Sequence, residues 1–167
     1  MKTSLLMNFD IDKDNATVHV KREFAAPVTD VWKAWTEPAL LDQWWAPKPW
    51  KAVTHHMDLR EGGHWLYAMV GPENEDHFAR LDYEKTTAPK HLEGLDAFCD
   101  KTGQVNSALP RTKWITTFTK AGDDTTLVQV YIKHDNLADL EKIIEMGFRE
   151  GFTAALENLD DLLASTR

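Results

Sequence analysis

The feature of this sequence that most constrains its fold is a long amphipathic segment near the C-terminal end, residues 136–164. Apolar and small side chains recur there in steps of three and four, which places them on one face of a helix. They are Leu137, Leu140, Ile144, Gly147, Phe148, Gly151, Phe152, Ala155, Leu159, Leu162 and Leu163. We predict one long helix, capped by Asp135 or Asn136. At about 1.5 Å per residue it would span roughly 40 Å, so a broad surface must cover its apolar face.

Two glycines, Gly147 and Gly151, lie one turn apart on the apolar face of this predicted helix, and a phenylalanine follows each. Glycine inside a helix costs about 1 kcal/mol relative to alanine, so its use indicates close backbone approach or open space. Two interpretations stay open: the glycines form the floor of a cavity, or Phe148 and Phe152 fill that space as a solid core. In the first case, the substitution Gly147→Leu should fill the cavity and abolish ligand binding.

The rest of the chain predicts mainly strands. Residues 16–24 alternate between apolar and polar side chains, as in a half-buried strand. Arg22 falls on the apolar face, either with its stem packed flat and its head in water or as a polar anchor pointing into a pocket. Two short helices follow, the first opened by Pro27 and the second capped by Thr36. Six further strands are expected at residues 51–59, 64–70, 76–87, 91–100, 112–120 and 125–134.

Six consecutive strands joined by short turns form an antiparallel meander, because parallel pairs need long crossovers. Such a sheet buries one face, and the long helix has the matching apolar stripe. We therefore predict an α+β fold: a curved antiparallel sheet of about seven strands wrapped around the long C-terminal helix, with two short helices after the first strand. The expected organisation is a single domain over residues 16–167, preceded by an N-terminal extension, residues 1–15, that frays or forms a short edge piece.

The overall charge and the cysteine content restrict the partners and the cellular compartment that we expect for this protein. A net charge of −8 argues against nucleic acid as a main partner, because phosphates would meet an acidic surface. The single cysteine, Cys99, excludes an internal disulfide framework and fits a reducing compartment. The sequence shows no signal peptide and no segment long and apolar enough to span a membrane, so we expect a cytoplasmic location.

We predict a ligand-binding cavity between the sheet and the C-terminal helix. Its wall would consist of aromatic and small residues with few polar anchors, as is usual for small-molecule sites. The candidate residues are Arg22, Trp65, Tyr67, Met69, Trp114, Thr116, Phe118, Gly147, Phe148, Gly151 and Phe152. The sequence leaves open which parity of each strand faces the cavity.

Two carboxylates, Glu23 and Glu141, are candidates for acid–base chemistry beside such a cavity. Burial would raise the pKa of a carboxylic acid there and allow it to exchange a proton with a ligand. The alternative places Glu141 in water at the sheet edge, so we assign no catalytic residue. The seven histidines lack the spacing of a metal motif, and His55 and His56 would point to opposite faces of a strand. We expect neither a metal ion nor a cofactor.

A run of aromatic and proline residues, Trp44-Trp45-Ala46-Pro47-Lys48-Pro49-Trp50, suggests an exposed surface that docks a protein partner. Trp44, Trp45 and Trp50 are the candidate partner-binding residues. The alternative interpretation is that the run plugs one end of the groove between the sheet and the long helix.

Five short motifs follow one another along the chain. They are Ala26-Pro27, Val31-Trp32-x-x-Trp35-Thr36, Trp44-Trp45-x-Pro47, Asp58-x-Arg60-x-Gly62-Gly63, and Gly147-Phe148-x-x-Gly151-Phe152 with Leu156 and Leu159. In this order they resemble the START-like superfamily, and within it the branch related to the C-terminal domain of the activator of the Hsp90 ATPase. The resemblance covers residues 16–163 and implies the helix-grip fold, whose members commonly hold an apolar or aromatic ligand between sheet and helix. Such relatives include polyketide cyclases, lipid or hormone binders and co-chaperones, which share no fixed catalytic constellation.

Three functions follow as expectations. The first is binding of a hydrophobic or aromatic small molecule in the cavity. The second is regulation of a chaperone or another protein partner, as the resemblance to the Hsp90 activator implies. The third is a cyclase- or hydrolase-like reaction in the same cavity. In each case we expect a monomer or a homodimer.

Overall fold

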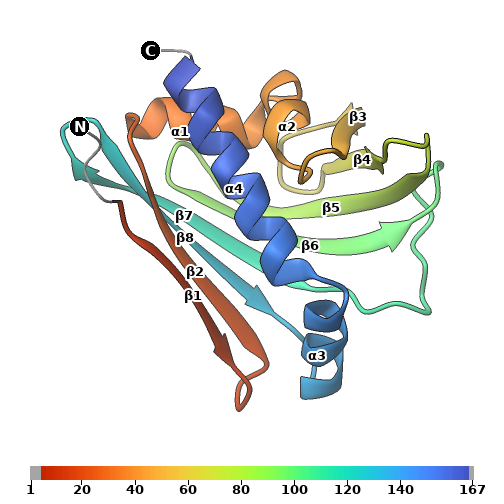
Figure 1. Ribbon diagram of the computed structural model, residues 1–167. Helices are drawn as coiled ribbons and strands as arrows, with labels where there is room; N and C mark the ends of the chain where they lie inside the picture. The colour runs from red at the N-terminus through yellow and green to blue at the C-terminus, as the bar shows by residue number, and fades with distance from the viewer. Residues whose placement is uncertain (1–4, 166–167) are drawn as a thin grey trace.

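Figure 1 shows the computed structural model of the protein, which describes residues 5–165. Its elements are β1 Met7–Asp12, β2 Thr17–Phe24, α1 Val28–Thr36, α2 Pro38–Trp44, β3 Lys51–Met57, β4 His64–Val70, β5 Asp76–Thr87, β6 His91–Cys99, β7 Lys113–Gly122, β8 Thr125–Lys133, α3 Leu137–Glu145 and α4 Phe148–Ser165. The parts of the domain prediction that concern residues 1–4 and 166–167 fall outside the described residues.

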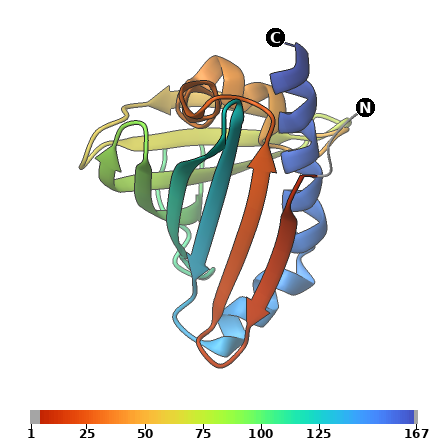
Figure 2. The same cartoon turned by 90° about the vertical axis from the view of Figure 1, so that its left-hand side faces the viewer.

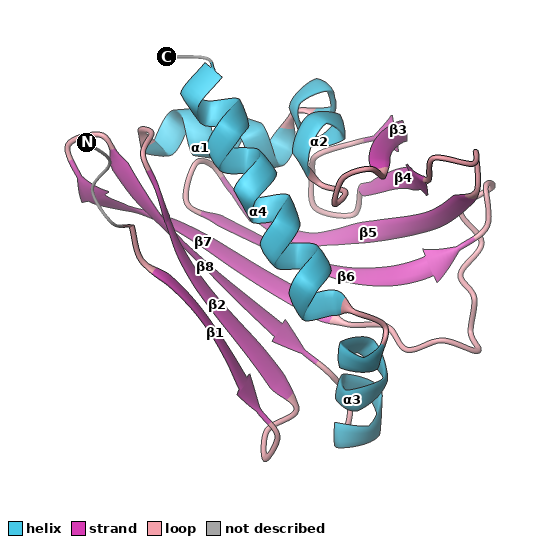
Figure 3. Ribbon diagram, viewed as in Figure 1, coloured by secondary structure: helices cyan, strands magenta, loops and turns pink. Residues whose placement is uncertain are grey.

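The strands form one antiparallel sheet of eight strands, in the order β1-β2-β8-β7-β6-β5-β4-β3 (Figure 3). The strands from β3 to β8 each pair with their neighbours in sequence, which confirms the predicted meander. β2 extends the sheet by pairing with β8, where Val20 lies opposite Val130. β1 pairs with β2 at the edge and adds one strand to the number expected.

The helix α4 crosses the concave face of this sheet, while α1 and α2 cover one end of the groove (Figures 1 and 2). Alternate residues of β2 and β8 point toward α4 and are buried, among them Val20 and Val130, each at most 1% exposed. They meet Leu156 and Leu159 of α4 in one hydrophobic core. The architecture is therefore the predicted α+β helix grip, with the sheet wrapped around the C-terminal helix.

The prediction of a single long helix is wrong, because Gly147 divides the segment into α3 and α4. Gly147 has a φ of +90°, a left-handed conformation that glycine adopts at helix ends without the steric cost of a side chain. Leu140 of α3 and Leu156 of α4 belong to the same core, so the apolar repeat continues across the break. The pattern of apolar residues therefore could not reveal it.

The predicted helix caps are correct at one site and wrong at another. The Asn136 side chain accepts the N–H of Asp139 at 2.8 Å, as expected for the residue before α3. Thr36 does not cap α2, since it is the last residue of α1 and its hydroxyl donates to the Trp32 carbonyl at 2.8 Å. Glu37 precedes α2 instead and makes no side-chain cap bond.

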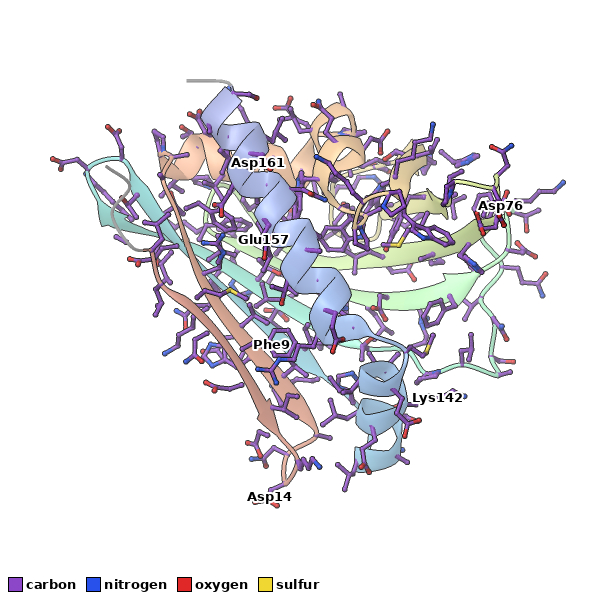
Figure 4. The ribbon with its side chains drawn as sticks, in the orientation of Figure 1. Phe9, Asp14, Asp76, Lys142, Glu157 and Asp161 are labelled. Atoms are coloured by element: carbon purple, nitrogen blue, oxygen red, sulfur yellow. The ribbon has the colours of Figure 1, made fainter. Side chains whose placement is uncertain are left out.

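Strand β1 lies within the residues that we assigned to an N-terminal extension, and it forms the short edge piece that was one of the two expected outcomes. Its Phe9 packs against Phe148, with 6.1 Å between ring centroids, and the Arg149 guanidinium lies 5.1 Å from the Phe9 ring. Figure 4 shows Phe9 between this edge of the sheet and the beginning of α4. Within residues 5–165, no helix has the length and apolar character needed to cross a membrane.

Candidate functional site

A cavity of about 320 Å³ lies between the first turns of α4 and the sheet. Its volume is near the lower end of the range of small-molecule sites, about 300–1,000 Å³. The sheet strands β4 to β8 form one wall, and the segment after α2, the end of α3 and the start of α4 form the other. Met146 lines the cavity and is 54% exposed, so the cavity opens to solvent at the junction between α3 and α4.

Four aromatic rings that pack against one another form part of the apolar wall. Phe148 and Phe152 stack one turn apart on α4, with ring centroids 5.4 Å apart and planes inclined by 14°. Trp114 of β7 meets both rings edge-on, at 5.9 Å and 5.6 Å between centroids. Trp45 completes the cluster at 5.8 Å from Trp114 and 6.0 Å from Phe152. Rings held in this way offer flat apolar surfaces, which suit an aromatic ligand.

Both glycines of the motif border the cavity, but for different reasons. A Cβ atom on Gly147 would meet nothing within 4 Å, and one on Gly151 would have Pro47 Cγ as its nearest neighbour at 3.8 Å. At Gly147 the positive φ already requires glycine. Gly151 lies inside α4, where its N–H bonds to the Gly147 carbonyl at 2.9 Å, and no backbone strain or close contact requires glycine at this position.

Asp96 of β6 brings a carboxylate to the wall of this largely apolar cavity. Its Oδ1 accepts the backbone N–H of Thr112 at 2.8 Å and the Thr112 hydroxyl at 2.5 Å. Its Oδ2 accepts the indole N–H of Trp114 at 2.6 Å. Burial raises the pKa of Asp96 above its ordinary value of 3.8, and these hydrogen bonds offset only part of that effect. Among the ion pairs of the described residues, none includes Asp96.

His134, just after β8, lines the same cavity and is 7% exposed. Its backbone N–H and its ring Nδ1 lie 2.9 Å and 3.2 Å from the carbonyl oxygen of Ala16. Because a carbonyl can only accept, the proton of the neutral ring is assigned to Nδ1, and Nε2 keeps its lone pair. Nε2 is buried and has no hydrogen-bond partner among residues 5–165. Burial lowers the pKa of His134 below 6.5 despite the opposing effect of nearby carboxylates, which favours this neutral form.

Tyr67 of β4 adds a hydroxyl to the cavity wall. The indole N–H of Trp45 donates to its phenolic oxygen at 3.0 Å. Burial raises the pKa of Tyr67 above its ordinary value of 10.0, so the phenol keeps its proton near neutral pH. The cavity therefore combines an aromatic wall with a small number of polar atoms from Tyr67, Asp96 and His134.

Seven of the eleven residues predicted to line the cavity do so. They are Tyr67, Met69, Trp114, Gly147, Phe148, Gly151 and Phe152. Trp65 and Thr116 border a second, smaller void of about 40 Å³. Phe118 is 1% exposed and packs against Trp35 in the core, so it contributes to the fold of the domain instead.

The position of Arg22 is a correction to the predicted site, because Arg22 lines neither cavity. It is 8% exposed, and its Nη2 donates to the carboxylate of Asp160 on α4. Its Nη1 donates to the Glu23 carbonyl at 3.0 Å, and its guanidinium lies 5.1 Å from the Phe24 ring. A charged group on the apolar face of β2 is thus accommodated by an ion pair with the helix that covers that face.

The tryptophan run does not form the exposed surface that its sequence suggested. Trp44 is completely buried, and its indole N–H donates to the Ala34 carbonyl at 2.8 Å. Trp45 lines the cavity, and Trp50 is half-buried with its ring centroid 5.5 Å from that of His77. The run therefore agrees better with a plug at the end of the groove than with a docking surface.

The two predicted acid candidates lie away from the cavity. Glu141 is exposed on α3, and Glu23 accepts the backbone N–H of Leu6 at 2.8 Å beside the edge strand. Within residues 5–165, no group of three or more His, Cys, Asp or Glu side chains is arranged as a metal site.

Asp96 and His134 were not among the predicted cavity residues, although strand periodicity could have found both. His134 continues the alternation of Val130 and Ile132, which are buried on the face of β8 toward α4. Asp96 shares the parity of Leu92, which is buried in the core. In both cases, a polar residue takes a position at which the alternation predicts a buried apolar side chain, and this is the signal that indicates a cavity residue.

Comparisons with known proteins agree with this architecture. The family model described as "Activator of Hsp90 ATPase homolog 1-like protein" matches residues 25–164. Protein Ms6760 from Mycobacterium smegmatis has 30% sequence identity and a TM-score of 0.86, over 96% of this chain and 97% of that one. A protein from Arthrobacter aurescens has 28% identity and a TM-score of 0.89, over 95% and 91% of the two chains. Protein NE0264 from Nitrosomonas europaea has 28% identity and a TM-score of 0.78, over 90% and 95%. Among curated proteins, none matches.

Proposed function

We propose that this chain, which belongs to the Activator of Hsp90 ATPase homolog 1-like family, binds a hydrophobic or aromatic small molecule in the cavity between α4 and the sheet. The observation that carries the proposal is the cavity of about 320 Å³, whose lining includes Gly147, Gly151 and the rings of Trp45, Trp114, Phe148 and Phe152. A solid core would have filled this space, because protein interiors are normally packed with few voids larger than a water molecule.

The position of the cavity supports the same proposal. Its mouth at the junction of α3 and α4 gives a ligand a route from solvent, since Met146 is both exposed and part of the lining. The rings of Trp45 and Trp114 lie deeper, among buried or half-buried side chains, where contact with an apolar ring would remove water from both surfaces. The single Cys99 fits a reducing compartment, so we also propose a cytoplasmic location.

The experiment that tests binding is a calorimetric titration of the protein with 1-methoxynaphthalene, a small apolar ring compound. The proposal predicts saturable binding to the native protein and its loss in Gly151→Leu, whose new side chain would occupy the cavity. Gly151→Ala is the matched control, because its Cβ would have only ordinary contact with Pro47 at 3.8 Å. If binding to Gly151→Leu equals binding to the native protein, the ligand lies elsewhere and the proposal is wrong.

A further inference from the structure

The polar residues that line the cavity differ in whether other protein groups already satisfy their hydrogen-bonding atoms. Asp96 and the phenolic oxygen of Tyr67 accept hydrogen bonds from neighbouring side chains. His134 Nε2 is buried without a partner among residues 5–165. A buried polar atom of this kind is unusual, since most are hydrogen-bonded to protein or ordered water. It therefore indicates which chemical group the cavity can recognise.

The hydrogen bond on the other side of the imidazole decides what His134 Nε2 can do. Nδ1 donates to the Ala16 carbonyl at 3.2 Å, which leaves Nε2 as an acceptor in the neutral ring. A ligand atom that meets Nε2 must then donate a hydrogen, as a hydroxyl or an N–H group does. An ether or carbonyl oxygen at this position would place two acceptors against each other.

The negative charge in and around the cavity further restricts the class of ligand that can bind. The Asp96 carboxylate lies in the same wall and has no ion-pair partner among the described residues, and the chain as a whole has a net charge of −8. A ligand carboxylate would therefore lose its hydration and meet like charge in a poorly hydrated space. These conditions favour a neutral ring compound over an acidic one of the same size.

We infer that the cavity selects neutral aromatic compounds that carry a hydrogen-bond donor, such as a phenolic hydroxyl, and that His134 Nε2 accepts the hydrogen of that group. This inference rests on the proposed ligand-binding function and adds the chemical class of the ligand. The ring of the ligand contacts Phe148, Phe152 and Trp114. His134 accepts the hydrogen bond from its hydroxyl or N–H group.

The test compares three probes that share one ring system: 1-naphthol, 1-methoxynaphthalene and 1-naphthoate. The methyl ether keeps the oxygen of the naphthol and replaces its hydrogen with a methyl group, so the change in the affinity ratio between the native protein and a His134 variant reports the donor. Near neutral pH we expect the native protein to bind 1-naphthol about tenfold more tightly than its methyl ether, the size of one well-placed hydrogen bond. 1-Naphthoate should bind more weakly than both.

Two substitutions of His134 assign the selectivity to Nε2. In His134→Asn the side-chain amide can still donate to the Ala16 carbonyl, but nothing replaces Nε2, so the affinity ratio should fall to about one. In His134→Gln the amide oxygen can reach the position of Nε2 and should retain part of the preference for 1-naphthol. Because the ratio is measured within each variant, a general change in stability does not produce the expected result.

The outcomes separate this inference from the function on which it rests. If both neutral probes bind with equal affinity to the native protein, the inference is wrong while ligand binding stands. If the preference for 1-naphthol persists in His134→Asn, another group recognises the donor and the role of His134 is wrong. If neither neutral probe binds, the proposed function itself fails, and the inference fails with it.

Discussion

The carbonyl oxygen of Ala16 accepts two hydrogen bonds from His134, one from the backbone N–H at 2.9 Å and one from Nδ1 at 3.2 Å. The first bond continues the pairing of β2 with β8, and the second fixes the orientation of the imidazole. The Ala16 carbonyl oxygen thus determines which nitrogen of the imidazole can accept a hydrogen bond from a ligand in the cavity. The consequences of this arrangement can be measured as a function of pH.

Acidification should reduce the free energy of unfolding of the native protein, partly through protonation of His134. Burial lowers the pKa of His134 below 6.5, so the unfolded chain binds a proton more readily than the folded one. The contribution of this group to stability is therefore present above pH 6.5 and is lost as the pH falls from 6.5 through the folded-state pKa. Urea unfolding at several pH values should show a smaller loss for His134→Gln than for the native protein. Equal losses would show that other groups control the pH dependence of stability in this range.

Affinity for 1-naphthol should fall in the same pH range. Protonation places a hydrogen on Nε2 and converts the acceptor into a donor, so the bond to the naphthol hydroxyl is lost. 1-Methoxynaphthalene is the control, since its affinity should decrease less. A titration series that shows parallel decreases for the two probes would instead indicate partial unfolding of the cavity.

The two glycines of the motif should respond in opposite ways to alanine. Gly147→Ala places a side chain at a φ of +90° and should reduce the free energy of unfolding by about 1–2 kcal/mol. Gly151→Ala lies within α4 and should raise the same quantity by up to about 1 kcal/mol. Urea unfolding checks both. A loss at Gly151 similar to that at Gly147 would mean that its Cβ lacks the space seen beside Pro47.

This difference also corrects the first mutational expectation. Gly147→Leu was expected to fill a space beside the middle of a helix, but the positive φ at this position makes any side chain strained. Gly151→Leu is the better variant for blocking the cavity, because it leaves the break between α3 and α4 unchanged. Loss of binding can then be separated from loss of stability.

Arg22 should matter for stability and not for binding. Arg22→Met keeps much of the buried stem and removes the charge that bonds to Asp160. Hydrogen bonds to charged groups contribute about 1.5–3 kcal/mol, and we expect a decrease in the free energy of unfolding of that order. The affinity of the folded variant for 1-methoxynaphthalene should remain that of the native protein. Loss of affinity without loss of stability would restore Arg22 as a cavity anchor.

Local patterns were sufficient to predict much of the sheet. β4 and β5 lie at the predicted residues 64–70 and 76–87, because alternating side chains bounded by glycine and proline turns define a strand without reference to the rest of the chain. The predicted wrapping of the sheet around the C-terminal helix followed from the need to bury two apolar faces against each other.

Other features depend on contacts that a local pattern does not contain. The break at Gly147 was hidden because α3 and α4 bury the same apolar repeat in one core. The partner of Arg22 lies 138 residues away on α4, so the alternation of β2 could show a misplaced charge but not the carboxylate that accommodates it. The role proposed for His134 depends on a backbone carbonyl 118 positions away.

The most direct test of the account is a crystal structure of the protein in complex with 1-naphthol. We predict electron density for the naphthalene ring inside the cavity, against the side chains of Trp114, Phe148 and Phe152, with the hydroxyl oxygen within hydrogen-bond distance of His134 Nε2. A ring bound outside this cavity, or a hydroxyl that points away from His134, would contradict the account.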